Sequence, residues 1–303
     1  MKAPKNILVV ISGKRKTHEA LERALLFVTN KAVHLHIFNA IYEPVMELSD
    51  VLSSAHREEM KQQYLADRHL YMDEIAAQLE NKGIKCSVHV AWHRELHEAI
   101  EQAAIELKPD LVIKRISADT DSINPFAMPV DRHLLRYCSV PLLLIKGSQW
   151  SKGPILATID PHASDEAHIT LNNKVLNYAK LLGKMTDNPV YGVASYIVPS
   201  MSPAIGLPGV DYDLIRQDTF KFYEEKMQTL LTAHNIPLSD MHIIEGQPQR
   251  AIPKFVEQND AHLVVLGTVG RTGISAAFIG NTAEHVLANL ECEVLALKPA
   301  KEI

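Results

Sequence analysis

The chain repeats itself once, and this repeat constrains its fold more than any other feature. Two pairs of segments match at a spacing of 152 residues, and the opening apolar run matches at a spacing of 148. The matching segments are 110–114 with 262–266, 132–146 with 284–298, and 7–12 with 155–160. A length of 303 residues is also about twice that of a usual domain. We therefore predict two related domains, residues 1–149 and residues 150–303.

Each half alternates between short runs of Val, Ile and Leu and longer stretches with helical spacing, such as 19–29, 59–82 and 165–183. Unbroken apolar strands between helices predict an α/β fold, with a parallel sheet covered by helices on both faces. We expect five strands per half, near 5–11, 33–40, 85–91, 110–115 and 141–146, then near 154–159, 190–196, 240–245, 262–267 and 293–298. Ligands of such sheets bind at the carboxyl ends of the strands, where the strand order reverses.

Net charge, apolar runs and cysteine content indicate which partners and which cell compartment to expect. A formal net charge of -5 gives no attraction for a polyanion, so we expect no nucleic acid partner. The apolar run 7–11 is too short for a signal peptide or a membrane span. Cys86, Cys138 and Cys292 are widely spaced, which favours a reducing compartment over disulfides or a zinc site. These features predict a cytoplasmic protein without a membrane partner.

A glycine-rich segment follows the strand expected at 262–267. Glycines there recur with the spacing Gly-x2-Gly-x9-Gly, and the polar residues that follow open the last expected helix. Glycine lets backbone N–H groups approach a phosphate closely, and a helix N-terminus carries a positive dipole end. The segment therefore predicts a phosphate cradle made by Gly267, Gly270, Arg271, Gly280, Asn281 and Thr282. The alternatives are that the glycines only make tight turns and that Asn281 only caps the helix, with Glu284 returning to the cap.

The corresponding segment of the first half lacks these glycines. Arg115, Ala118 and Met128 stand where the second half has its three spaced glycines. Ser12 stands where Asp160 ends the first strand of the second half. A carboxylate at that place can accept hydrogen bonds from an adenine amine or a ribose hydroxyl. We therefore predict a nucleotide site in the second half and a degenerate one in the first.

These motifs resemble those of the universal stress protein family, whose ATP-binding members carry Gly-x2-Gly-x9-Gly-Ser/Thr after the fourth strand and Asp after the first. The resemblance covers essentially the whole chain and is strongest over 263–299. It implies two tandem domains with the adenine nucleotide alpha hydrolase-like fold, and ATP with Mg²⁺ as the ligand of the second. It also implies a stress-induced protein that supports survival under starvation, oxidative stress or DNA damage. Asn281 departs from the family pattern of Ser or Thr.

Three functions remain open from the residues alone. The first is a nucleotide-responsive module without catalysis, and the second is a slow ATP hydrolase that would use Asp160 and Arg271. The third is a scaffold or apolar-ligand protein, in which the proline-rich segment 197–210 covers a pocket. The protein partners are not identified, and both a monomer with an internal pseudo-dimer and a homodimer fit a tandem chain.

Histidines are the remaining candidates for chemistry. His34 and His36 lie two residues apart on one expected strand, so they share a face and could chelate a metal. His89, His93 and His242 lie on or near other strands. Because no Cys or carboxylate partner is identifiable for them, we expect these histidines to be solvated or hydrogen-bonded.

Overall fold

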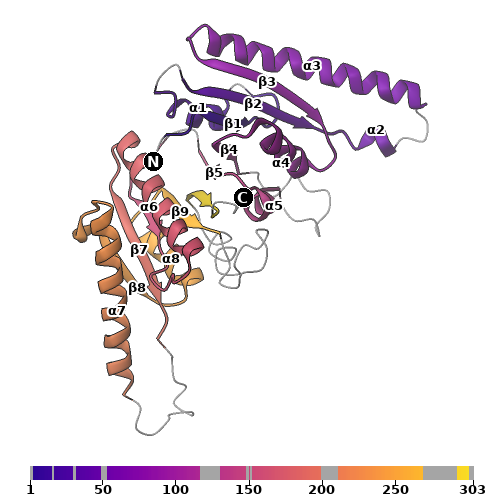
Figure 1. The fold of residues 1–303 in the computed structure, drawn as a ribbon. Coiled ribbons are helices and arrows are strands. Elements are labelled where there is room, and N and C mark those ends of the chain that lie inside the picture. The colour runs from indigo at the N-terminus through magenta and orange to yellow at the C-terminus, as the bar shows by residue number, and fades with distance from the viewer. Residues whose placement is uncertain are drawn as a thin grey trace. The chain divides into compact units, whose positions relative to one another are not determined.

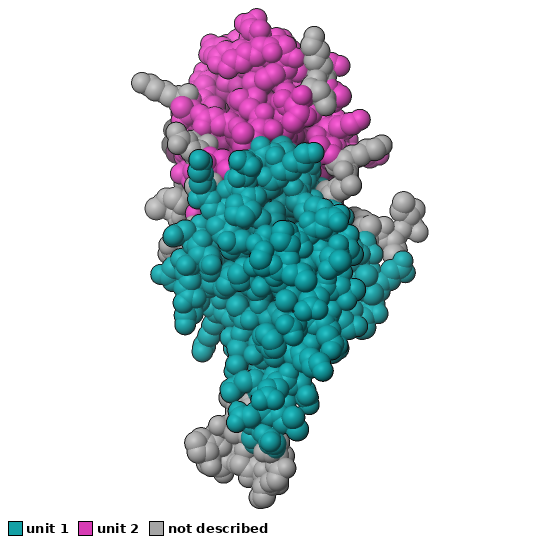
Figure 2. Space-filling view, turned by 90° about the vertical axis from the view of Figure 1, so that its left-hand side faces the viewer, with its two compact units in different colours: residues 1, 151–303 teal, residues 2–150 magenta. Residues whose placement is uncertain are grey.

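The chain forms two compact units in the computed structural model, an N-terminal unit of residues 2–150 and a C-terminal unit that runs from residue 151 to residue 303. Figure 2 colours the two units separately. The structure describes residues 3–15, 17–29, 32–48, 53–116, 130–147, 150, 152–198, 211–268 and 292–299.

The N-terminal unit is a parallel sheet with the strand order β3-β2-β1-β4-β5. Its elements are β1 (Asn6–Val10), α1 (Glu19–Leu25), β2 (His34–Ile41), α2 (Val45–Leu48), α3 (Ser54–Glu80), β3 (Lys85–Trp92), α4 (Leu96–Leu107), β4 (Leu111–Arg115), α5 (Val130–Tyr137) and β5 (Leu142–Ile145). The inner strands consist of apolar residues that are almost completely buried, such as Leu8 and Val112. This burial on both faces explains why their sequences are continuous apolar runs.

Helices cover both faces of this sheet. Helix α1 packs on β1 and β4, and α3 packs along β3, whereas α4 packs on β2 and β1 and α5 on β5. Right-handed crossovers place α1 and α3 on one face and α4 and α5 on the other. Figure 1 shows α3 lying along β3 at one edge of the sheet.

The C-terminal unit repeats this architecture with the order β10-β9-β6-β7-β8, again parallel. Its elements are β6 (Ile155–Thr158), α6 (Glu166–Thr186), β7 (Val190–Tyr196), α7 (Tyr212–Ala233), the 3-10 helix η3 (Leu238–Asp240), β8 (Met241–Glu245), α8 (Pro248–Gln258), β9 (Leu263–Gly267) and β10 (Glu293–Leu297). Helix α6 packs on β6 and β9, α7 on β7 and β8, and α8 on β7.

The predicted parallel α/β fold is confirmed, and each expected strand lies within two residues of an observed one. Helix ends differ more. Helix α3 begins at Ser54 instead of residue 59, because the Ser53 hydroxyl accepts the N–H of His56 at 3.2 Å and caps the helix earlier. Helix α1 ends at Leu25, four residues before the helical spacing does. The short elements α2 and η3 were not expected.

Candidate functional site

The carboxyl ends of β6 and β9 lie side by side at the centre of the C-terminal sheet. Ala157 pairs with Val265. Three residues further on, Asp160 leaves β6 and Thr268 leaves β9, so the two positions are level with each other. The strand order also reverses between β6 and β9. This is the place where open parallel sheets form a ligand crevice.

The backbone of Asp160 is fixed by one side chain from α6. Asn172 accepts the N–H of Asp160 at its Oδ1 atom, 3.1 Å away, and donates from Nδ2 to the carbonyl oxygen of Asp160 at 2.8 Å. Asn172 is almost completely buried. A buried amide that makes both bonds holds the strand end in one position.

The Asp160 carboxylate takes part in the turn that follows. Its Oδ1 atom accepts the N–H of His162 at 3.0 Å. The His162 ring stacks on Phe222 with 4.9 Å between the centroids and meets Tyr223 edge-on at 5.0 Å. Two aromatic residues of α7 therefore position His162, and the backbone of His162 orients the Asp160 carboxylate.

Gly267 and Thr268 have packing roles that explain their identity. A Cβ atom on Gly267 would lie 2.5 Å from Cδ2 of Leu171 on α6. Thr268 is buried, and both its N–H and its hydroxyl donate to the carbonyl oxygen of Leu297, at 2.9 and 3.1 Å. These bonds anchor the point where the glycine-rich segment begins.

Two of the residues expected in the site, Asp160 and Gly267, are thus brought to neighbouring strand ends. The other five lie outside the described residues, namely Gly270, Arg271, Gly280, Asn281 and Thr282. The proline-rich segment 199–210 also lies outside them, as do Ala118 and Met128 of the first half.

A lysine contributes positive charge near this edge of the sheet. The Lys174 ammonium on α6 donates to the carbonyl oxygen of Lys298, just after β10, at 2.8 Å. Burial lowers the pKa of Lys174. A partly desolvated cation is stabilised by a nearby anion, because solvent screens the pair less than it would at the surface.

The corresponding strand end of the N-terminal unit is filled by ion pairs. Lys114 donates from Nζ to Asp131 Oδ1 at 2.6 Å and to the carbonyl oxygen of Arg115 at 2.9 Å. The Lys114 and Asp131 side chains are only 4% and 13% exposed. Arg115 pairs with Glu19 of α1 at 3.2 Å. Charged side chains of the chain itself thus occupy the place where β9 ends in a glycine.

The histidines of β2 and β3 form a hydrogen-bonded cluster around one hydroxyl. Ser87 Oγ lies 3.1 Å from His34 Nε2, 2.9 Å from His36 Nδ1 and 3.0 Å from His89 Nε2. Burial and the two neighbouring imidazoles lower the pKa of His36 to about 4. Among the residues that the structure describes, no group of three His, Cys, Asp or Glu side chains is arranged to hold a metal ion.

Comparison with known proteins settles the family. The model of the universal stress protein family matches residues 4–146 and again residues 155–298. The chain belongs to the universal stress protein family. It has two tandem copies of the family domain, each with the parallel α/β fold described above.

Two relatives in this family have the same tandem length. The chain is 33% identical to universal stress protein E of Escherichia coli K12 over 296 residues. The aligned region covers 97% of this chain and 94% of the relative. It is 32% identical to a universal stress protein E homolog of Haemophilus influenzae, with 98% of each chain covered. A protein of unknown function from Pseudomonas aeruginosa PAO1 has a similar crystal structure, with a TM-score of 0.74 at 27% identity, covering 98% of this chain and 93% of that one.

No helix in the described part of this universal stress protein is long and apolar enough to cross a membrane.

Sequence analysis did not find several residues of the site and of the equivalent place in the N-terminal unit. Asn172 and Lys174 lie on α6, and Thr268 and Lys114 at strand ends. Only Asn172 left a signal, as a polar residue on the apolar face of an expected helix. The partners of the other three are distant in sequence and were not predictable from local pattern.

Proposed function

We propose that this protein is a nucleotide-responsive stress protein, in which the C-terminal unit binds ATP with Mg²⁺ and the N-terminal unit does not. Asp160 would contact the adenine amine or a ribose hydroxyl. Gly267, Gly270, Arg271, Gly280, Asn281 and Thr282 would surround the phosphates. Binding would alter protein partners in the cytoplasm under starvation, oxidative stress or DNA damage, without catalysis.

One observation carries the proposal. Asp160 and the start of the glycine-rich segment lie at adjacent strand ends, at the point where the strand order reverses. The carboxylate is an acceptor suited to amine and hydroxyl donors, and the Lys174 ammonium favours an anion near the same edge. The N-terminal unit has Lys114 with Asp131 and Arg115 with Glu19 at its equivalent edge, which supports a single site per chain.

The test is calorimetric titration of ATP with Mg²⁺ into the full chain, freed of bound ligand and checked for folding. We expect micromolar affinity for one site. Gly270→Arg should abolish binding, because its side chain blocks the approach of phosphate to the backbone. The matched control is Ala118→Arg at the equivalent position of the first half, which should bind ATP as the unmodified protein does.

A pair of substitutions separates a ligand contact from a structural role at Asp160. Both Asn and Asp side chains can accept the N–H of His162, so Asp160→Asn keeps the turn. If the carboxylate contacts the nucleotide, Asp160→Asn should lower ATP affinity about tenfold or more with an unchanged unfolding temperature. An Asp160→Asn variant that binds ATP normally would restrict Asp160 to a structural role.

Absence of nucleotide binding would replace the proposal by one of its alternatives. If the folded, ligand-free protein does not bind ATP, the alternative of a scaffold or apolar-ligand protein with a vestigial phosphate loop is favoured. Turnover of ATP that persists through purification and vanishes in Asp160→Ala would instead favour a slow hydrolase.

A further inference from the structure

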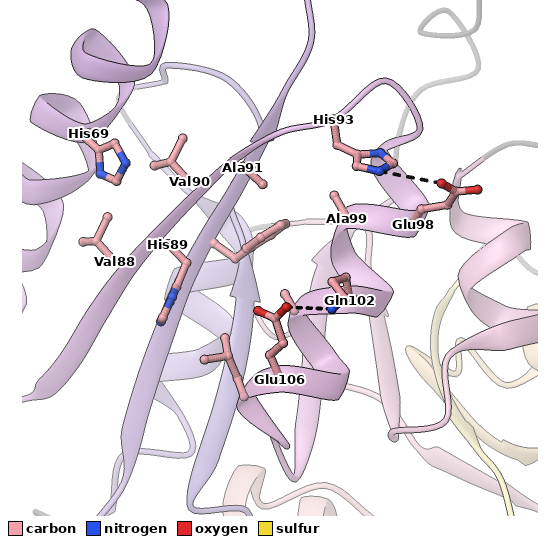
Figure 3. A pocket seen from close by; sticks show the side chains of 13 residues that line it. His69, Val88, His89, Val90, Ala91, His93, Glu98, Ala99, Gln102 and Glu106 are labelled. Atoms are coloured by element: carbon pink, nitrogen blue, oxygen red, sulfur yellow. Dashed lines mark hydrogen bonds and ion pairs between the residues drawn. The ribbon is translucent and has the colours of Figure 1, made fainter. Parts of the chain in front are cut away.

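A hollow of about 700 Å³ lies in the N-terminal unit between β3 and α4. Its walls come from β2, β3, α3 and α4, and the ATP site proposed above uses none of them. Figure 3 shows Glu106 and Gln102 of α4 on the same side as His89, with His69 beyond Val88 and Val90.

Among the described residues, the backbone along one wall has N–H and C=O groups that no other backbone group pairs. Strand β3 ends the sheet order and pairs with β2 alone among the strands that the structure describes. The N–H of His93 donates to Ile41 of β2 at 3.1 Å, so the N–H and C=O groups of every second residue, His93, Ala91 and His89, face β2. Those of Val88 and Val90 point away from the sheet, and both residues line the hollow. An edge strand with free N–H and C=O groups is a template for another strand.

A comparison of the two repeats explains why the hollow exists. Ala103 of α4 stands 152 residues before Phe255 of α8, the spacing of the repeat. In the C-terminal unit the Phe255 ring packs on His242 of β8, with 4.9 Å between the centroids, and against a buried apolar cluster. Ala103 has only a methyl group where Phe255 has a ring, and the equivalent place beside β3 belongs to the hollow. Strand β3 also has eight residues where β8 has five, which lengthens the free edge.

The other wall is acidic. Glu98, Gln102 and Glu106 follow each other at helical spacing of four, so they lie along one side of α4. Neither Lys nor Arg occurs among the described residues that line the hollow. Burial lowers the pKa of His89, which leaves its imidazole neutral at pH 7. Below this acidic row, Ala99 and Ala103 form an apolar floor.

We propose that the hollow and the free edge of β3 bind an extended, basic segment of a partner protein, which adds one strand to the sheet. Its backbone pairs with the N–H and C=O groups of Val88 and Val90, the recognition mode known as β-augmentation. Two Lys or Arg side chains of the segment enter the hollow, one beside Glu98 and the other beside Glu106, which lie about two helical turns apart on α4. The small residues Ala99 and Ala103 leave room for the methylene stems of these side chains.

The test measures binding of a labelled peptide, Thr-Lys-Val-Lys-Val-Lys-Thr, to the full chain by fluorescence polarisation. We expect saturable binding that falls at least tenfold in Ala103→Phe, which fills the hollow as Phe255 does in the other unit. It should fall similarly in the double variant Glu98→Gln with Glu106→Gln. A peptide with N-methylated amides at alternate residues should bind at least tenfold more weakly, because it cannot pair with the edge.

A proline pair tests the edge itself. Val90→Pro removes an outward N–H, which an edge strand tolerates, and should abolish peptide binding. The matched control is Ile243→Pro at the equivalent outward position of β8, since the N–H of Gly246 donates to Tyr196 and sets the same alternation there. This variant should bind the peptide normally. Circular dichroism and the unfolding temperature establish that both variants are folded.

Several results would overturn the proposal. No saturable peptide binding up to millimolar concentration would do so, as would equal binding of the methylated peptide or of Ala103→Phe. Equal affinity for spermidine would identify a site for small cations instead. A dimer that dissociates in Val90→Pro would show that a second copy of this chain covers the edge.

Discussion

At the scale of single residues, Lys114 and Asp131 form an ion pair outside the proposed nucleotide site. Both side chains are nearly buried, and their charged atoms are 2.6 Å apart. Removing one partner of a buried pair leaves the other charge desolvated without its counter-charge, whereas removing both can be almost neutral.

Asp131→Ala should therefore destabilise the N-terminal unit by about 3 kcal/mol. The measurement is urea denaturation followed by tryptophan fluorescence, because Trp92 and Trp150 are the chain's two tryptophans and both belong to this unit. The control is Asp67→Ala, which breaks the exposed Lys14–Asp67 pair, whose side chains are 43% and 61% exposed. This change should cost less than about 1 kcal/mol. Equal losses in the two variants would contradict the buried role of Lys114 with Asp131.

His36 predicts a dependence of stability on pH. The pKa of His36 is lowered to about 4 in the folded protein, from 6.5 in the unfolded chain. The unfolded chain therefore binds more protons at His36 in this interval. The contribution of His36 to stability is greatest above pH 6.5 and falls as the pH drops toward 4. His34 and His89 face the same group and contribute to this shift. We expect the loss due to His36 to be no more than about 2 kcal/mol, because the ring is only half-buried and solvent screens it.

His36→Gln removes this titration and keeps a side chain that can bond Ser87. Its urea midpoint, measured by tryptophan fluorescence between pH 7.5 and pH 4.5, should fall less than that of the unmodified protein. The fall in urea midpoint that remains in this variant comes from the other histidines. Parallel pH profiles for the two proteins would show that His36 is not a source of acid sensitivity.

At the scale of elements, glycines set how closely segments approach each other. A Cβ on Gly153 would clash with the backbone oxygen of Asp260, just before β9. A Cβ on Gly267 would instead meet the flexible end of the Leu171 side chain on α6. A side chain can move aside more easily than a backbone carbonyl that belongs to a packed segment.

Gly153→Ala should thus cost more than Gly267→Ala, with losses of about 3 and about 1 kcal/mol. Thermal unfolding followed by far-ultraviolet circular dichroism ranks the two. Gly147→Ala is the control, because no atom of the described residues other than its chain neighbours lies within 4 Å of the added Cβ, and it should change stability by a few tenths of a kcal/mol. The reverse ranking would mean that the backbone around Asp260 moves aside more easily than the Leu171 side chain does.

At the scale of the whole molecule, the two repeated units have different side chains at equivalent places. The C-terminal unit has Asp160 and Gly267 at its central strand ends, and the N-terminal unit has ion pairs there. The N-terminal unit has the hollow beside β3, and the C-terminal unit fills that place with Phe255. This division supports one nucleotide per chain and a separate binding edge in the other unit.

Hydrogen–deuterium exchange of the full chain with and without ATP tests this division. We expect slower exchange at the Asp160–His162 turn and at Thr268 when ATP is bound. Exchange at the equivalent strand ends of the N-terminal unit, at Ser12 and Ile116, should not change. Equal protection in both units would contradict the proposal of a single site.

The sequence by itself determined the family, the repeat and the ten strands. Each inner strand is an unbroken apolar run because both of its faces are buried, and such runs can be recognised in the sequence. The same local reading found Asp160 and Gly267, since both stand at the end of such a run. Their positions relative to the strands follow from pattern alone.

Only the tertiary structure decided which side chains meet at those ends. Lys114 finds Asp131, Asn172 holds Asp160, and Leu171 explains Gly267 through contacts between distant segments. The hollow beside β3 likewise depends on Ala103 lacking a ring that Phe255 supplies in the other unit. Backbone hydrogen bonding and alternating burial are periodic, so sequence reveals them. The partner of a given side chain depends on how helices pack on the sheet, and no local period encodes that packing.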